Sequence, residues 1–328
     1  GCGGLTNIVI PNGTTSIGAN AFENCYILQE VNFGDGCNIG DYAFKNCDAL
    51  TSIINSGNIG NYAFYDCDAL KEVKLNEGTT TIGQQAFYEC SSLNKITLPK
   101  SLYSIGYEAF NYCSNLKEVH FNGEMSDWCN ITFNIYSSSS GYEYRNATSN
   151  PLYYAHNLYI KGLKVDNLEI LGEIATLKSY VFAGCNFENV VLDNSIRTIN
   201  SNAFYNCTNL KSVVIGNGVA TIAENAFQNC SKLEKITLGN NVANMSYNTF
   251  NGCNGLDTIV CYGITPAVVA TSGGQYKQFT SVEPDECLLI VPEEATVDYI
   301  LAPVWGAYGN LQLHNNKYYT VKATSNDE

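Results

Sequence analysis

One spacing of apolar residues recurs along most of this chain. It is clearest in residues 82–98, IGQQAFYECSSLNKITL, which give the template IGxxAFxxCxxLxxVxL. Within each run of copies the template cysteine returns every 20 to 23 residues. A fixed period of this length predicts a solenoid, in which each repeat forms one coil that stacks on the coil before it. The cysteines that mark the copies are Cys2, Cys25, Cys47, Cys67, Cys90, Cys113, Cys185, Cys207, Cys230 and Cys253.

Each part of the template predicts its own local structure. Leu93, Ile96 and Leu98 are spaced by three and then two residues, which suits a short strand entered from a bend, with Ile96 and Leu98 on one face. We expect this strand to pair in parallel with its copy in the next coil. The AFxxC part has helix-like spacing but is short, so a single turn of α-helix or 3₁₀-helix is predicted there. Gly83 is expected to supply permissive backbone where the chain turns a corner.

The run IGxxAFxxCxxLxxVxL resembles the consensus of the BspA-like leucine-rich repeat proteins, and the resemblance covers most of residues 1–265. It implies a leucine-rich-repeat solenoid, with short strands in a parallel sheet and short helical or 3₁₀ turns on the other side. It also implies export to the cell surface or beyond it, a role in adhesion or host contact, and no catalytic residues.

The template lapses twice, which divides the chain into four predicted segments. Residues 1–121 form a first block of repeats, which opens in mid-repeat and is therefore expected to be truncated at its start. Residues 122–176 form an irregular, aromatic-rich insert. Repeats resume over residues 177–261, and residues 262–328 are predicted to be an atypical capping segment and tail, because a solenoid needs a different final unit to cover its core.

The insert still carries traces of the repeat. Cys113 and Cys185 are 72 residues apart, close to three periods, so we expect the insert to occupy coil positions in distorted form. Residues 158–165 alternate on either side of Lys161 and Gly162, which predicts a hairpin. The serine run at residues 137–140 indicates a flexible polar linker.

The two ends of the chain are expected to differ. Residues 288–291 predict a last strand, and the short helical stretch after it should bury Tyr299 and Trp305 as a cap. The polar tail from residue 315 is expected to fray. The first coil should instead present an uncovered apolar end. That end includes Leu5, Ile8 and Ile10.

Composition limits the partners and the compartment. The chain has 328 residues and a formal net charge of −14. Nucleic acids and anionic membranes are bound through clustered Lys and Arg, so this balance argues against both. No run of about 18 apolar residues is present, so no membrane-spanning segment is predicted. The resemblance implies an extracellular or cell-surface protein, with a signal peptide that has been removed or lies outside this sequence.

The fourteen cysteines suggest either disulfides or a buried ladder. Ten occupy one template position among apolar neighbours, where cysteine behaves as a small hydrophobe, so we predict that these thiols are reduced and buried. The remaining four could form disulfides or could be plain core residues. These are Cys37, Cys129, Cys261 and Cys287.

No catalytic or metal-binding constellation is recognisable. His120, His156 and His314 are the three histidines, and none falls in a motif with Ser, Cys or a carboxylate. The template puts His120 on an outward strand position, so we predict a lone surface histidine there. CxxC pairs and glycine-rich phosphate loops are absent, so no metal, no cofactor and no enzymatic activity are predicted.

Two classes of function remain. The first is a secreted or cell-surface interaction protein of the adhesion type, which binds a host or matrix protein or another macromolecule. The alternative is a glycan-binding module that uses the aromatic insert and belongs to a carbohydrate-acquisition system. Trp128 and the tyrosines of the insert motivate this alternative, although the favoured interpretation of these aromatics is that they fill the core where the repeat lapses.

The binding face is predicted on the outward side of the strands, near residues 70–160. Charges there balance, and one column alternates in sign from Glu72 to Lys95 to Glu118, which would stabilise the sheet modestly. A rigid neutral face of this kind should bind an extracellular protein or glycan with little salt dependence. The candidate residues are Asn32, Lys74, Lys95, Thr97, His120 and Trp128.

Overall fold

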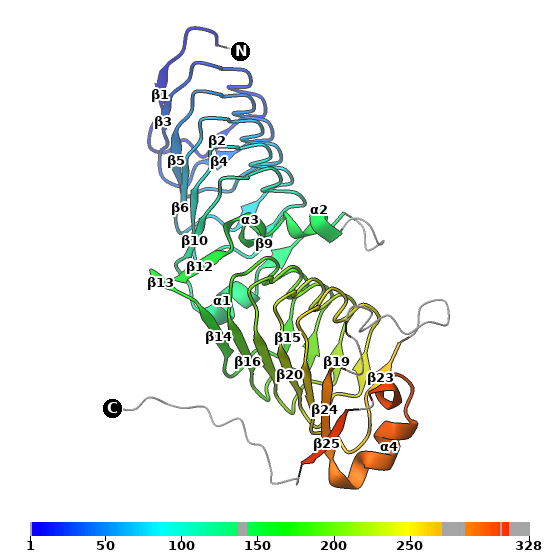
Figure 1. Ribbon diagram of the computed structural model, residues 1–328. Helices are drawn as coiled ribbons and strands as arrows, with labels where there is room; N and C mark the ends of the chain where they lie inside the picture. The colour runs from blue at the N-terminus through cyan, green and yellow to red at the C-terminus, as the bar shows by residue number, and fades with distance from the viewer. Residues whose placement is uncertain (1, 137–142, 271–281, 283–285, 309, 315–328) are drawn as a thin grey trace. The chain divides into compact units, whose positions relative to one another are not determined.

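The computed structural model describes residues 2–136, 143–270, 282, 286–308 and 310–314 (Figure 1). The chain divides into two compact units, and the boundary between them falls inside the predicted insert. Unit 1 comprises Gly1–Val165 and Tyr180–Cys185, and unit 2 comprises Asp166–Ser179 and Asn186–Glu328. Each unit is built of stacked coils with parallel strands. The predicted linker at 137–140 and the tail from residue 315 lie outside the described residues.

The main sheet of unit 1 confirms the predicted strands. It has six strands in the order β13-β12-β10-β8-β6-β5, and all neighbours are parallel except β12 and β13. A separate parallel pair, β1 (Asn7–Val9) and β3 (Glu30–Asn32), lies in the coils before it. The six strands are β5 (Ser52–Asn55), β6 (Glu72–Leu75), β8 (Lys95–Leu98), β10 (Glu118–Phe121), β12 (Asn157–Ile160) and β13 (Leu163–Lys164).

A second ladder of two-residue strands runs through unit 1 at the template isoleucine. The sequence pattern did not predict it, because two extended residues are too few to show a period of two. Its members pair in parallel from coil to coil. They are β2 (Ser16–Ile17), β4 (Asn38–Ile39), β7 (Thr81–Ile82), β9 (Ser104–Ile105) and β11 (Thr132–Phe133).

The AFxxC part of each coil forms tight turns, so the predicted turn of helix is wrong. Gln85 and Glu89 have left-handed backbones, with φ of 50° and 60°. Their N–H groups donate to the next coil, at 2.9 Å from the carbonyl oxygens of Tyr107 and Asn111. A helix would use these donors within its own coil, whereas the stack uses them to join one coil to the next.

Stacked phenylalanine rings fill the centre of both units. In unit 1 neighbouring rings lie 5.1 to 5.5 Å apart with planes within 13° of parallel. In unit 2 the corresponding distances are 5.0 and 5.5 Å. Such pairs contribute about 0.5–1.5 kcal/mol each beyond their buried area. The rings belong to Phe22, Phe44, Phe64, Phe87 and Phe110 in unit 1 and to Phe204, Phe227 and Phe250 in unit 2.

The template cysteines lie beside this stack as free, buried thiols, which confirms the prediction; only Cys2 is exposed. Six of them also donate to the carbonyl oxygen of a phenylalanine in the preceding coil. The thiol of Cys90 donates to the carbonyl oxygen of Phe64, and that of Cys113 to Phe87, both at 3.1 Å. The four cysteines off the template, Cys37, Cys129, Cys261 and Cys287, are also free and buried, so they are core residues.

Close backbone approach, and not a special backbone angle, explains the template glycine. The φ of Gly83 is ordinary, but a Cβ built there would lie 2.5 Å from the backbone nitrogen of Asn61 in the preceding coil. At Gly106 the equivalent distance, to the nitrogen of Gln84, is 2.3 Å. Real Cβ atoms do not come this close to backbone, so the corner role predicted for Gly83 is wrong.

The insert occupies coil positions, as predicted. Strand β12 continues the main sheet beside β10, and β11 continues the second ladder beside β9. The predicted hairpin is confirmed, since β12 and β13 are antiparallel around Lys161 and Gly162, whose φ values of 49° and 83° suit a tight hairpin turn. Three short helices complete the insert: α1 (Met125–Cys129), α2 (Glu143–Ala147) and α3 (Leu152–Ala155).

Unit 2 repeats the same plan with a seven-stranded parallel sheet and a second ladder of five two-residue strands. The sheet consists of β14 (Asn167–Ile170), β16 (Asn189–Leu192), β18 (Ser212–Ile215), β20 (Lys235–Leu238), β22 (Thr258–Cys261), β24 (Leu288–Pro292) and β25 (Leu311–His314). The ladder consists of β15 (Thr176–Leu177), β17 (Thr198–Ile199), β19 (Thr221–Ile222), β21 (Asn244–Met245) and β23 (Val268–Val269).

The capping segment of unit 2 is largely as predicted. After β24 come η1 (Glu293–Ala295), α4 (Thr296–Leu301) and η2 (Trp305–Ala307). Tyr299 and Trp305 are buried, and they donate hydrogen bonds to the carbonyl oxygens of Gly263 and Ala267 at 3.0 and 2.9 Å. The segment at 288–291 is a strand but not the last one, because β25 pairs with it in parallel.

At the other end of the chain the prediction holds only in part. Leu5 and Ile8 are half-buried, while Ile10 is 8 % exposed and therefore belongs to the core. The N–H of Ile10 donates to the carbonyl oxygen of Asn32 in the next coil at 2.8 Å, which holds that part of the strand against its neighbour.

Candidate functional site

The outward side of the main sheet in unit 1 carries two rows of polar side chains in register. Their neighbours along each strand, such as Val73 and Ile96, point into the core, because side chains alternate across a strand. We call these outward residues the strand face. The first row is Glu72, Lys95, Glu118 and Asn157, and the second is Lys74, Thr97, His120 and Tyr159.

Charges on the strand face are paired across adjacent strands. The Nζ of Lys95 lies 3.5 Å from Oε1 of Glu72, and both side chains are substantially exposed. Glu118 lies on the other side of Lys95, so the predicted alternation of sign along this row is confirmed. A solvent-exposed pair of this kind stabilises a sheet by about 0–1 kcal/mol, so these charges contribute little to the fold itself.

His120 is partnered, so its prediction as a lone surface histidine is wrong. Its Nε2 lies 2.8 Å from Oε2 of Glu118 on the same strand. Its ring stacks on Tyr159 of the next strand, with centroids 4.4 Å apart and planes 7° from parallel. These contacts hold the imidazole in one orientation at the centre of the strand face.

Trp128 is absent from this surface, which corrects its place among the candidate binding residues. The ring is fully buried, packs edge-on against Phe121 at 5.5 Å, and donates Nε1–H to the carbonyl oxygen of Val181 at 3.0 Å. It fills the core where the repeat lapses. The glycan-binding alternative therefore loses the aromatic residue that chiefly motivated it.

The remaining candidates divide between two surfaces. Lys74, Lys95, Thr97 and His120 lie on adjacent strands of one sheet. Asn32 lies on β3, which is not hydrogen-bonded into that sheet. Asn157 and Tyr159 of the strand face were missed, although Tyr159 lies within residues 158–165, which were predicted to form a hairpin.

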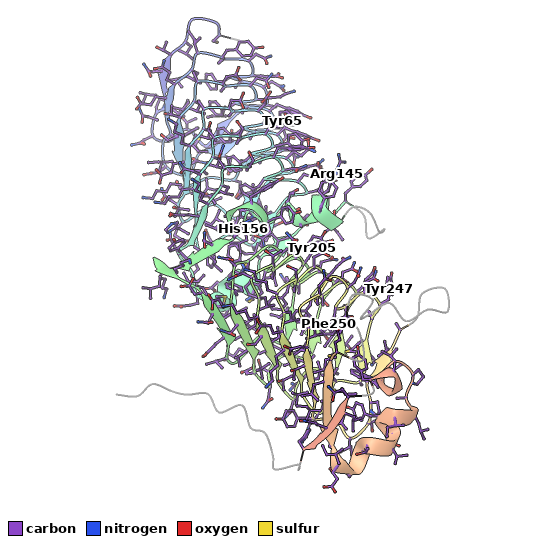
Figure 2. The ribbon with its side chains drawn as sticks, in the orientation of Figure 1. Tyr65, Arg145, His156, Tyr205, Tyr247 and Phe250 are labelled. Carbon is purple, nitrogen blue, oxygen red and sulfur yellow. The ribbon has the colours of Figure 1, made fainter. Side chains whose placement is uncertain are left out.

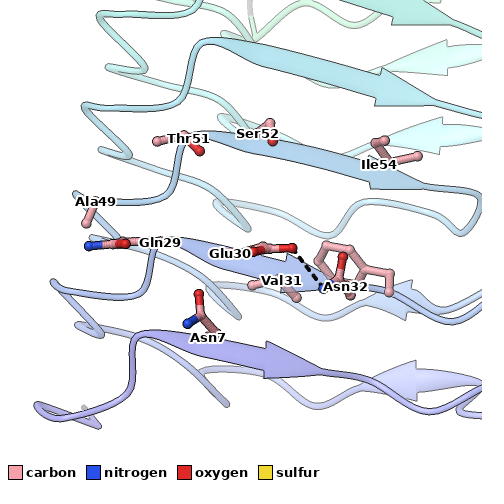
Figure 3. Close-up of a pocket in the computed structure, with 10 residues that line it drawn as sticks. Asn7, Gln29, Glu30, Val31, Asn32, Ala49, Thr51, Ser52 and Ile54 are labelled. Atoms are coloured by element: carbon pink, nitrogen blue, oxygen red, sulfur yellow. Dashed lines mark hydrogen bonds between the residues drawn. The ribbon is translucent and has the colours of Figure 1, made fainter.

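Asn32 borders a hollow where the main ladder is interrupted between β3 and β5 (Figure 3). The hollow has a volume of about 720 Å³ and an open, mostly polar lining. The Nδ2 of Asn32 donates to Glu30 at 2.9 Å on one side of it. Amide, hydroxyl and carboxylate groups provide its polar lining. The lining residues are Asn7, Gln29, Glu30, Val31, Asn32, Phe33, Ala49, Thr51, Ser52 and Ile54.

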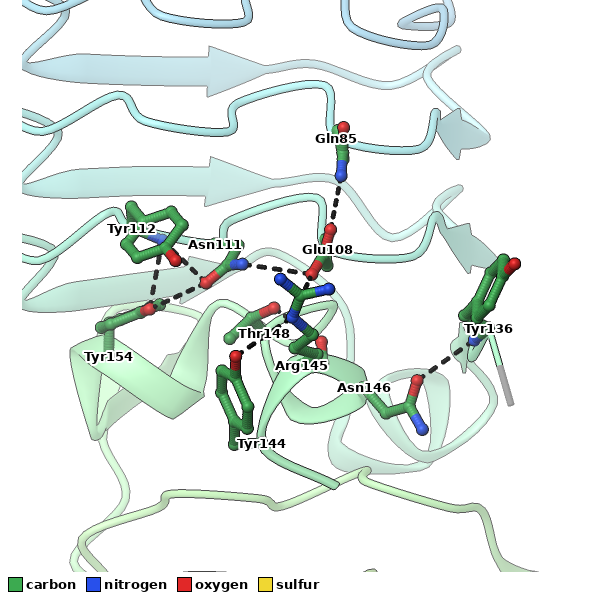
Figure 4. A network of polar contacts seen from close by, with 10 residues as sticks. All are labelled: Gln85, Glu108, Asn111, Tyr112, Tyr136, Tyr144, Arg145, Asn146, Thr148 and Tyr154. Atoms are coloured by element: carbon green, nitrogen blue, oxygen red, sulfur yellow. Dashed lines mark hydrogen bonds and ion pairs between the residues drawn. The ribbon is translucent and has the colours of Figure 1, made fainter. Parts of the chain in front are cut away.

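A buried polar network fixes the insert to the last full coil of unit 1 (Figure 4). The carboxylate of Glu108 is nearly inaccessible, and it accepts hydrogen bonds from the side chains of Gln85 and Asn111. Nε of Arg145, on α2, lies 3.4 Å from Oε1 of Glu108. Tyr154 on α3 donates its hydroxyl to Asn111 at 3.2 Å. A buried carboxylate needs such partners, so the network has a structural role.

The corresponding outward row of unit 2 is mainly apolar. The row runs across four adjacent strands in the order Val191, Val214, Thr237 and Val260. Segments β8 and β20 have the same sequence, KITL, yet Thr97 is half-buried and Thr237 is buried. The two units therefore present different chemistry on equivalent strands.

The described residues contain no group of three or more His, Cys, Asp or Glu side chains placed to hold a metal ion. Within the same residues, no helix is long and apolar enough to cross a membrane.

Comparisons with known proteins agree with this geometry. The model for the BspA type leucine rich repeat region matches residues 1–58, 38–145 and 155–265, with 6 copies. No curated protein matches the chain.

Solved structures of similar fold come from bacteria. A leucine-rich repeat protein from Bacteroides ovatus is 25 % identical with a TM-score of 0.50, over 97 % of this chain and 85 % of that one. The pneumococcal vaccine antigen PcpA is 20 % identical with a TM-score of 0.49, over 94 % of this chain and 78 % of that one. A leucine-rich repeat protein from Eubacterium ventriosum is 19 % identical with a TM-score of 0.45, over 98 % of this chain and 86 % of that one.

Proposed function

This chain belongs to the BspA-type leucine-rich repeat family, and we propose that it is an extracellular or cell-surface protein that binds a host or matrix protein through the strand face of unit 1. Its role in this proposal is adhesion, and no chemical step is involved. The ligand is a macromolecule, since the surface is extended and the row from Lys74 to Tyr159 crosses four strands.

The observation that carries the proposal is the fixed, in-register array of polar groups on the strand face. Strands in a sheet lie about 4.8 Å apart, so Lys74, Thr97, His120 and Tyr159 form a row of side chains at regular intervals. Neighbouring coils hold the strands rigidly, so little conformational entropy is lost when a partner docks. Repeat proteins commonly bind partners over extended surfaces of this kind.

Balanced charge on the strand face favours a protein ligand over a polyanion. Lys95 and His120 each lie beside a glutamate, so neither is available as an unpaired cation for sulfate or phosphate groups. Binding to such a face should depend weakly on ionic strength, because few counterions are released.

The proposal is tested by applying the purified protein in parallel to an array of extracellular-matrix and host-surface proteins and to a glycan array, at about 50 and about 300 mM salt. We expect retention on one or more proteins with less than about a threefold change in affinity between the two salt concentrations. Retention on glycans alone would overturn the proposal in favour of the glycan-binding alternative.

A further inference from the structure

The turn side of unit 1 carries a surface unlike the strand face. Five tyrosine rings from four successive coils follow one another there, and Figure 2 shows one of them, Tyr65, at the edge of the coils away from the strands. Neighbouring centroids lie 4.6, 6.2, 4.8 and 5.2 Å apart. We call this surface the tyrosine ridge. It consists of Tyr42, Tyr62, Tyr65, Tyr88 and Tyr112.

All five rings of the ridge are partly accessible to solvent. Four of the rings are half-buried, and Tyr112 is 46 % exposed. Tyr42 and Tyr62 stack with planes 5° apart, and Tyr65 and Tyr88 with planes 7° apart, so each pair forms one continuous aromatic surface. Tyrosine in this setting combines a large apolar contact area with a hydrogen-bonding group, which is typical of binding surfaces.

The ridge is not required by the fold. Tyr42, Tyr62 and Tyr112 have left-handed backbones, with φ between 57° and 63°, a conformation that a bulky residue adopts at a cost. Unit 2 forms the same turns mainly with asparagine, the residue best suited to this backbone among those with a side chain. The asparagines are Asn202, Asn206, Asn225, Asn229 and Asn248.

Carboxylates surround the ridge. Asp66 and Glu89 lie on its turns, and Asp48 and Asp68 lie one step further along the same coils. They are close enough to act on one another: burial, followed by the charges of Asp66 and Asp68, raises the pKa values of the Asp48 and Glu89 carboxyl groups. Among the described residues, Lys45 places an ammonium group over these rings and four carboxylates lie near it, so this surface carries an excess of negative charge.

A cation already occupies part of the ridge. The Nζ of Lys45 lies 5.6 Å from the ring centroid of Tyr42 and 5.3 Å from that of Tyr65. Both distances are within the range in which an ammonium group is attracted to an aromatic face. Lys45 therefore demonstrates, within the molecule, the contact that a cationic side chain of a partner would make with the rings further along.

From these observations we infer that the tyrosine ridge binds a Lys- or Arg-rich segment of another protein. The rings of Tyr65, Tyr88 and Tyr112 provide cation–π and apolar contacts, and Asp66 and Glu89 provide the complementary charge. Arginine suits this surface best, because its planar guanidinium stacks on aromatic faces and pairs with carboxylates at the same time. The inference concerns a surface separate from the strand face and holds whether or not the strand face binds a ligand.

The test measures binding of a synthetic, fluorescently labelled ten-residue peptide rich in Arg and Lys by anisotropy, using the intact protein. A labelled glutamate-rich peptide of equal length is measured separately, and a neutral oligosaccharide serves as competitor. We expect the cationic peptide to bind, with an affinity that falls at least about tenfold between about 50 and about 300 mM salt. The anionic peptide should not bind, and the oligosaccharide should not displace the cationic one.

Two pairs of substitutions examine the ridge itself. Tyr65→Ala with Tyr88→Ala should weaken binding at least about tenfold by removing the rings. Asp66→Asn with Glu89→Gln should weaken it to a similar degree and flatten its salt dependence. The second pair changes no side-chain volume, and Asn tolerates the left-handed backbone, so this variant should fold as the parent does.

Matched control variants distinguish binding at the tyrosine ridge from nonspecific attraction of the peptide to an acidic protein. Glu169→Gln with Glu234→Gln removes the same two charges from exposed positions in unit 2, and Tyr103→Ala removes a tyrosine that is 59 % exposed elsewhere in unit 1. Neither should change peptide binding. Equal losses in a control and a ridge variant, binding of the anionic peptide, or displacement by the oligosaccharide would overturn the inference. Lys95→Ala should leave peptide binding intact, because it belongs to the strand face.

Discussion

In six coils the thiol of the template cysteine contacts one specific atom, the carbonyl oxygen of the phenylalanine one coil earlier. The Sγ–O distances range from 3.1 to 3.3 Å for Cys47, Cys67, Cys90, Cys113, Cys230 and Cys253. A small apolar group with a weak donor is what this position needs, because it is dry and has one carbonyl to satisfy. Cysteine therefore recurs here for its packing and its S–H group, and no disulfide is involved.

Removing one of these thiols should destabilise the protein measurably. Cys90→Ala deletes the contact with Phe64 and leaves a small void among fully buried neighbours. We expect a loss of about 1–2 kcal/mol in the free energy of unfolding by urea. Cys2→Ala, at the exposed cysteine, is the control and should change it by less than about 0.5 kcal/mol. Equal stability of the two variants would show that the thiol contact contributes nothing.

Burial of the thiols predicts how stability depends on pH. It raises the pKa values of Cys47, Cys261 and Cys287 from 9.0 to about 12. Native thiols therefore keep their protons at a pH where those of the unfolded chain ionise. Their contribution to stability is complete below pH 9.0 and is lost as the pH rises from 9.0 towards 12.

Urea titrations at about pH 7.5, 9 and 10.5 measure this effect. The unfolding midpoint should fall between the second and third values, and the fall should be smaller when Cys47 and Cys287 are replaced by alanine. A midpoint that rises above pH 9.0 would contradict the assignment of these thiols as buried and neutral.

Elements in this protein are joined coil to coil along three lines: the main sheet, the ladder of two-residue strands, and the turns. One close approach of backbone to backbone occurs where the ladder meets the turn, at the template glycine. Gly83 and Gly106 of unit 1 have no room for a Cβ against the coil before. Unit 2 has Asn200, Ala223 and Ser246 at the same template position, so its coils accommodate a Cβ there.

The space around the template glycine differs between coils of unit 1, so alanine substitutions at two of these glycines should have different effects on stability. Gly106→Ala places a Cβ about 2.3 Å from the backbone nitrogen of Gln84, so the coils must separate, at a cost of about 1–3 kcal/mol. Gly18→Ala, at the same template position in the first coil, meets no atom within 4 Å and should be neutral. Thermal denaturation followed by circular dichroism distinguishes the two, and equal melting temperatures would exclude the close approach as the reason for the glycine.

The capping segment of unit 2 should contribute strongly to stability through Trp305. Trp305 is buried against Tyr299 with centroids 5.8 Å apart, and it donates a hydrogen bond to Ala267. Trp305→Ala should therefore cost about 3–5 kcal/mol and lower the melting temperature by several degrees. Leu301→Ala, at an exposed position of α4, should have little effect. An unchanged melting temperature for Trp305→Ala would show that this segment does not act as a cap.

Prediction from sequence was accurate where the template carries a period. Leu93, Ile96 and Leu98 alternate as a strand does, so the main sheet could be anticipated strand by strand. It failed for features that depend on a neighbouring coil: the two-residue ladder, the turns with left-handed backbone, and the space around Gly83. None of these leaves a periodic trace within a single repeat.

The residues of the candidate site were likewise predicted correctly where the template is periodic and wrongly where it is not. Lys95, Thr97 and His120 were placed correctly on adjacent outward positions, because the template fixes their register. Trp128 was misplaced, since no period sets the direction of a side chain in the irregular insert, and its ring entered the core. Whether the correctly placed residues bind a ligand stays a prediction.

For the molecule as a whole, the two units combine one architecture with different outward chemistry. The row that reads Lys74, Thr97, His120 in unit 1 is replaced by mainly apolar residues in unit 2, and the net charge of −14 lies largely away from the balanced strand face. The two units therefore share one scaffold, and they differ in the outward row that carries Lys74, Thr97 and His120 in unit 1.

The identical KITL segments of β8 and β20 allow the most direct test of this account. Affinity for the array protein that retains the parent is measured by surface plasmon resonance for Lys95→Ala with Thr97→Ala, and for the matched pair Lys235→Ala with Thr237→Ala. We predict at least about a tenfold loss for the first pair, an unchanged affinity for the second, and melting temperatures that show both variants folded. Equal affinities for the two variants, with both folded, would contradict binding through the strand face of unit 1.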